Sequence, residues 1–62
     1  MTGKARIEYM DQFGNWQYLR TVTAVRVTIR LALEQALRVQ ACAGRARAVD
    51  DETGAMIDMD MK

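Results

Sequence analysis

Residues 4–22, KARIEYMDQFGNWQYLRTV, have the pattern of two β-strands around a turn. Apolar and polar side chains alternate over residues 4–11, which is the two-residue period of a strand with one buried face. The segment QFGN supplies a turn, because Gly14 and Asn15 tolerate positive φ, and NWQYLRTV returns with aromatic and β-branched residues. The stretch therefore predicts a β-hairpin.

The register of this hairpin predicts its buried face. With Asp11 opposite Trp16, Tyr9 faces Tyr18 and Ala5 faces Val22. The shared face then carries Ala5, Ile7, Tyr9, Trp16, Tyr18 and Val22. We expect this face to be core rather than a stacking platform for nucleic-acid bases, because no other face of residues 4–11 is apolar enough to pack a helix. Phe13, at the turn, is a contact residue if exposed and closes the core if folded back.

Residues 23–43 are predicted to form one amphipathic helix, with Thr23 as N-cap and Gly44 at the C-terminal end. At about 100° per residue, one stripe contains Val25, Ile29, Ala32, Ala36, Val39 and Ala43. An opposite polar row contains Arg26, Arg30, Glu34 and Arg38. Four more apolar side chains flank that row: Val27, Leu31, Leu33 and Leu37. This apolar surface is wider than a small sheet covers, which predicts a further contact.

Residues 45–60, RARAVDDETGAMIDMD, predict a second hairpin around the turn DETG. Pairing Asp50 with Ala55 places Ala48 opposite Ile57 and Ala46 opposite Met59 on an apolar face. On the other face it places Arg45 opposite Asp60 and Arg47 opposite Asp58, as cross-strand ion pairs. Residues 48–62 hold five acidic residues against one basic residue, whereas residues 1–47 hold eight basic against three acidic. Strand pairing and the solubility of the turn largely explain this acidic cluster.

The predicted fold class is α+β: two antiparallel β-hairpins joined by one amphipathic helix (ββαββ), with the helix packed on one face of the sheet. Residues 1–62 are expected to form a single domain near the lower size limit for an independent core. The order of the strands, and whether the hairpins pair within or between chains, stay open. The short length and this layout are typical of small bacterial or mobile-element reading frames and imply no activity.

The residue types favour a protein that is not an enzyme and that holds no metal or cofactor. The chain has no histidine, which removes the usual catalytic bases and triads, and one cysteine, Cys42, placed near a helix C-terminus where the dipole disfavours a thiolate. Asp50, Asp51 and Glu52 are adjacent rather than spaced as in a calcium loop. Charges interrupt every apolar stretch, so we expect no membrane span and a cytoplasmic protein.

Surplus apolar side chains predict a non-enzymatic interaction module that forms a homodimer and binds another protein. The candidate interface contains Val27, Leu31, Leu33, Leu37, Met59 and Met61. The alternative function is nucleic-acid binding through an arginine row on the helix, which contains Arg26, Arg30 and Arg38. Glu34 interrupts that row, and a net charge of +1 is small for such a protein, so a solvated helix face is favoured.

Overall fold

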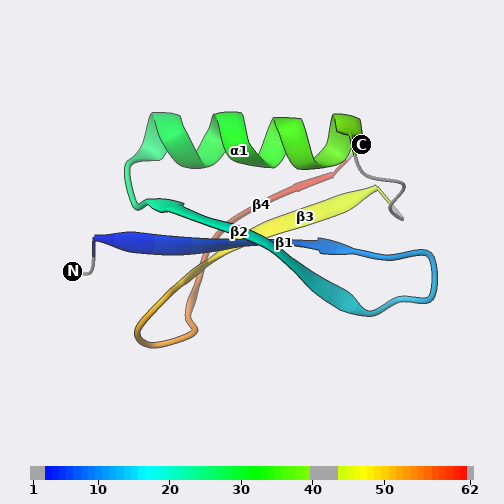
Figure 1. The fold of residues 1–62 in the computed structure, drawn as a ribbon, viewed down its shortest axis with the longest axis horizontal. Helices are drawn as coiled ribbons and strands as arrows, with labels where there is room; N and C mark the ends of the chain where they lie inside the picture. Colours follow the sequence, from blue (N-terminus) through cyan, green and yellow to red (C-terminus); the bar gives the residue numbers. More distant parts are fainter. Residues whose placement is uncertain (1–2, 40–43, 62) are drawn as a thin grey trace.

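The computed structural model describes residues 3–39 and 44–61 and confirms the small α+β fold (Figure 1). Two β-hairpins flank one helix, in the order β1 (Lys4–Met10), β2 (Trp16–Thr23), α1 (Arg26–Val39), β3 (Arg45–Asp50) and β4 (Met56–Met61). The strands form one antiparallel sheet in the order β2-β1-β3-β4. The hairpins therefore join within the chain, through β1 and β3, and leave β2 and β4 as the edge strands.

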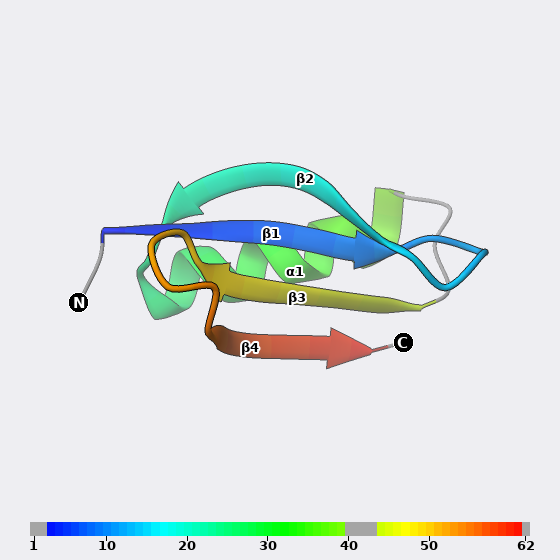
Figure 2. The ribbon, with the colours of Figure 1, turned by 90° about the horizontal axis from the view of Figure 1, so that it is seen from below.

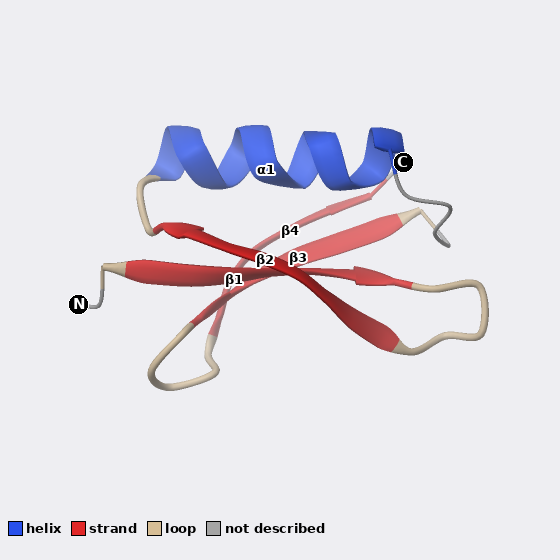
Figure 3. Cartoon of the chain, in the orientation of Figure 1, coloured by secondary structure: helices blue, strands red, loops and turns tan. Residues whose placement is uncertain are grey.

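Helix and sheet form two layers, with α1 lying along one face of the sheet (Figures 2 and 3). The helix contacts all four strands. The opposite face of the sheet, here called the open face, is not covered by any described segment of the chain. Each turn between paired strands ends in a glycine with positive φ, 85° at Gly14 and 78° at Gly54, a conformation that other residues adopt only with strain.

The core lies between α1 and the two central strands and is built largely from alanine. Ala5, Ala46 and Ala48 lie on the sheet side and are fully buried, and their small side chains allow the helix to approach the strands closely. The larger buried side chains that fill the layer are Ile7, Ile29, Leu33 and Leu37. Leu19, Val22 and Ala24 pack against this cluster from its margin.

The register of the first hairpin departs from the predicted one at a β-bulge. Ala5 pairs with Val22 and Ile7 with Arg20, as the predicted register requires, but Glu8 pairs with Tyr18, so Leu19 is an extra residue in β2. The side chains of β2 between the turn and the bulge therefore lie on the face opposite to the predicted one. Tyr18 is consequently 59% exposed, and the prediction that Tyr18 and Trp16 lie in the core is wrong.

A second bulge changes the register of the C-terminal hairpin. The Asp50 N–H donates to the Ala55 carbonyl and Val49 pairs with Met56, as the predicted turn requires. Ala48, however, pairs with Asp58, which leaves Ile57 as an extra residue in β4. The expected pairs of Arg45 with Asp60 and Arg47 with Asp58 are therefore wrong. Their partners across the strands are Met61 and Met59.

The helix begins later than predicted and presents a different face to the sheet. Thr23 is the last residue of β2 rather than the N-cap, and the first helical hydrogen bond runs from the Ile29 N–H to the Val25 carbonyl. Val25 is half exposed, whereas Leu33 and Leu37 are buried. The predicted end of the helix at Ala43, like the environment of Cys42, lies outside the described residues.

Candidate interaction surfaces

The side of α1 that faces away from the sheet exposes two aliphatic side chains one turn apart. Val27 is 67% exposed and Leu31 is 61% exposed. Leu33 is fully buried, and Leu37 is nearly so, because their positions on the helix point toward the central strands. These two leucines belong to the core, so the prediction that they lie on an exposed surface is wrong.

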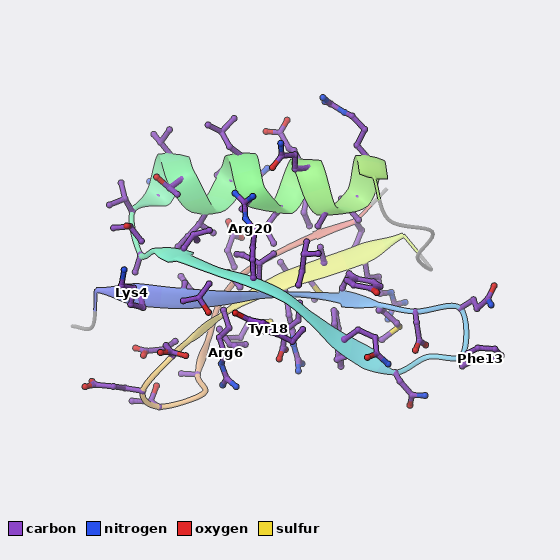
Figure 4. The ribbon with its side chains drawn as sticks, viewed as in Figure 1. Lys4, Arg6, Phe13, Tyr18 and Arg20 are labelled. Atoms are coloured by element: carbon purple, nitrogen blue, oxygen red, sulfur yellow. The ribbon has the colours of Figure 1, made fainter. Side chains whose placement is uncertain are left out.

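A groove of about 410 Å³ runs between α1 and the edge strand β2. Its walls are Arg20 on the strand and Thr28, Leu31, Glu34, Gln35 and Arg38 on the helix. Figure 4 shows the Arg20 side chain directed from β2 toward the helix, while Tyr18 extends to the open face. Arg20 and Arg38 form no ion pair with any residue that the structure describes. The groove thus combines an exposed leucine, two available guanidinium groups and one carboxylate.

On the other side of the helix, Arg30 ties α1 to the edge strand β4. Its guanidinium lies 3.3 Å from Asp58 Oδ2 and 3.9 Å from Asp60 Oδ2. The bulge at Ile57 causes this contact, because it turns both aspartates toward the helix side of the sheet. All three side chains are partly exposed, so each ion pair contributes at most about 1 kcal/mol to stability.

The same aspartates cap the outer edge of β4. Asp58 Oδ1 accepts a hydrogen bond from the Met59 N–H at 2.8 Å, and Asp60 Oδ1 accepts one from the Met61 N–H at 3.0 Å. Each carboxylate therefore uses one oxygen for Arg30 and the other for a backbone donor of the edge. An edge strand with satisfied donors is a poor template for another strand.

The open face of the sheet carries a charged and aromatic cluster at its centre. Arg47 Nε donates to Glu8 Oε1 at 2.7 Å, and the Arg47 guanidinium lies 4.2 Å from the centre of the Trp16 ring. The partly buried ion pair and the cation–π contact fix all three side chains on this face. Because Arg47 covers the Trp16 ring, that ring is not a free stacking surface for a base. Met59 and Met61 lie on this face along β4, away from Val27 and Leu31.

At the tip of the first hairpin, Phe13 is 80% exposed, so it does not close the core (Figure 4). Asp11 organises the turn: its Oδ1 accepts hydrogen bonds from the Phe13 and Asn15 N–H groups, and its Oδ2 accepts one from the Gln17 amide. The bond from the Asn15 N–H is the main cause that lowers the pKa of Asp11 below its ordinary value, followed by that from Gln17.

The predicted arginine row is divided by these contacts. Arg26 and Arg38 are exposed and make no ion pair within the described part of the chain, whereas Arg30 is engaged by Asp58 and Asp60. Sequence reasoning missed the role of Arg20 in the groove. It also missed the capping of β4, whose signal is the alternation of methionine and aspartate over residues 56–61.

Residues 3–39 and 44–61 contain no group of three cysteine or carboxylate side chains arranged to hold a metal ion. Within the same residues, no helix is long and apolar enough to cross a membrane. Comparisons with protein-family models, with curated proteins and with solved structures found no match to this chain.

Proposed function

We propose that the protein is a non-enzymatic interaction module. It forms a homodimer with a second copy of its own chain and also binds another protein. The observation that carries this proposal is the exposure of Val27 and Leu31 on the uncovered side of the only described helix. Exposed aliphatic residues that lie together, beside groups of both charges, are typical of protein interfaces. A chain of this size also gains stability from self-association, because its own core is small.

Strand β4 supports a second protein-binding surface. Met56, Met59 and Met61 are exposed along this strand, and methionine adapts its shape to irregular partners. The capped backbone of β4 favours contacts through side chains rather than through strand addition. A single cysteine in the whole chain fits a reducing compartment, so we place this activity in the cytoplasm.

Sedimentation equilibrium over a wide range of protein concentration tests self-association. The proposal predicts a reversible monomer–dimer equilibrium that is weakened when Val27 and Leu31 are replaced together by serine. The matched control replaces Met56 and Met61 by serine, which removes exposed apolar side chains from β4 only. A monomer at the highest concentrations would contradict the proposal of self-association.

Nucleic-acid binding is the alternative, and it is supported by Arg20, Arg26 and Arg38, which have no ion-pair partner among the described residues. Guanidinium groups bind phosphate well, and the resulting affinity falls steeply with salt. The test is titration of a labelled mixed-sequence duplex and its single strand across a salt series. Submicromolar affinity that is lost in R26E/R38E would favour this alternative, whereas no binding at low salt would reject it.

A further inference from the structure

We propose that the homodimer forms through the β2 edge and the adjoining groove of α1, with β2 of one copy antiparallel to β2 of the other, so that the sheet continues across a two-fold axis. This inference rests on the self-association proposed above and assigns its surface. The two edge strands differ, because among residues 3–39 and 44–61 side chains cap backbone N–H groups of β4 but not the outward N–H of Thr21 in β2.

Strand β4 is closed to strand addition. The Met59 and Met61 N–H groups already donate to Asp58 and Asp60, and Arg30 holds both carboxylates in place. A sheet with two open edges can add copies head to tail without limit, whereas a sheet with one closed edge can only pair once. The capped edge therefore selects a closed dimer over a filament.

Strand β2 offers the complementary open edge. The Ala24 N–H donates to the Gly3 carbonyl and the Asp51 N–H donates to the Lys4 carbonyl, which shows that Gly3 turns its backbone toward β2 and Lys4 turns its backbone toward β3. Successive residues of an antiparallel strand turn their backbone groups to alternate sides, so Arg6, like Lys4, turns its backbone toward β3. Thr21 pairs with Arg6, and its backbone therefore points outward from the edge. In the described part of the chain, no side chain caps its N–H.

The groove beside β2 is complementary to itself. It holds Arg20 and Arg38 together with Glu34, so a two-fold axis can bring an arginine of one copy to the carboxylate of the other. Antiparallel pairing of the β2 strands also makes the two helices antiparallel. Leu31 lies in the wall of the groove near the middle of α1 (Arg26–Val39), so the two Leu31 side chains approach each other across the axis.

The test is sedimentation equilibrium of Thr21→Pro beside the matched Met59→Pro. Proline removes an outward N–H in both variants, and an edge strand tolerates it there, but only Thr21 lies in the proposed seam. We expect Thr21→Pro to raise the dimer Kd at least about tenfold, because a two-fold seam loses two backbone hydrogen bonds, one from each copy. Met59→Pro should leave the dimer Kd unchanged. Circular dichroism verifies that both variants fold.

Leu31→Lys provides a second variant that leaves the sheet intact, because Leu31 is on the exposed side of the helix. It should weaken the dimer as well. A wild-type dimer whose Kd is unaffected by both Thr21→Pro and Leu31→Lys would overturn this seam while self-association stands. A wild-type protein that stays monomeric would overturn both the seam and the proposed self-association.

Discussion

Replacing Leu33 by alanine is expected to cost the fold at least about 3 kcal/mol. Leu33 is completely buried between α1 and the central strands. Leucine-to-alanine changes in a core remove about 2.7–5 kcal/mol, with the larger values where neighbours cannot fill the void. The sheet side of the same buried cluster includes Ala5, Ala46 and Ala48, which have no flexible atoms to move into the space.

The assay is urea unfolding of Leu33→Ala beside Leu31→Ala, which has the same chemistry on the same helix. Both are measured at low protein concentration, so that self-association contributes little to the apparent stability. Because Leu31 is exposed, its truncation should change the free energy of unfolding by no more than about 0.5 kcal/mol. For a domain of this size, a loss of 3 kcal/mol lowers Tm by roughly 12–24 °C. Equal destabilisation by the two variants would refute the assigned orientation of the helix.

Three further changes test the turns and the helix contact. Arg30→Met should lower the free energy of unfolding by about 0.5–1 kcal/mol at low salt and by less at high salt. The control Arg26→Met breaks no ion pair with a described residue and should leave the free energy of unfolding unchanged. Equal effects of the two variants in urea titrations would count against the Arg30 contact. The lowered pKa of Asp11 means that its carboxylate stabilises the fold above the unfolded pKa and that this contribution disappears as pH falls through the folded pKa. Asp11→Asn should therefore flatten the loss of stability below about pH 4, and an unaltered acid profile in thermal melts would show that the turn bonds do not contribute. Gly54→Ala should lower the free energy of unfolding by about 1 kcal/mol through its positive φ alone, since an added Cβ meets no atom within 4 Å. The control Gly3→Ala should have no such cost. An unchanged free energy of unfolding in Gly54→Ala would contradict the turn conformation.

The elements of the fold were predictable from local patterns, because alternation, turn residues and helix formers all act over a few neighbouring positions. The turn closed by Asp50 and Ala55 is one example, since Gly54 marks it directly in the sequence. The pairing of Val49 with Met56 is another, because it follows from counting across that turn. These predictions depend only on local chemistry.

The two bulges could not be predicted in this way. One extra residue, Leu19 or Ile57, leaves the alternation readable on either side of it. It nevertheless moves the side chains on one side of the bulge to the other face: those before Leu19 in β2 and those after Ile57 in β4. The partner of Asp58 thereby changes from Arg47 to Arg30, which lies 28 positions away in the sequence. The orientation of the helix failed for a related reason, because Leu33 and Leu37 compete with Val25 for one narrow sheet surface and only tertiary packing decides between them.

The most direct test of the proposed assembly is isotope-filtered nuclear Overhauser spectroscopy on a mixture of labelled and unlabelled protein. This measurement detects only contacts between copies. A seam at β2 predicts contacts between copies at Thr21 and between the Leu31 methyl groups, with none at Met59 or Met61. Contacts between copies confined to the methionines of β4, or none at all, would contradict it.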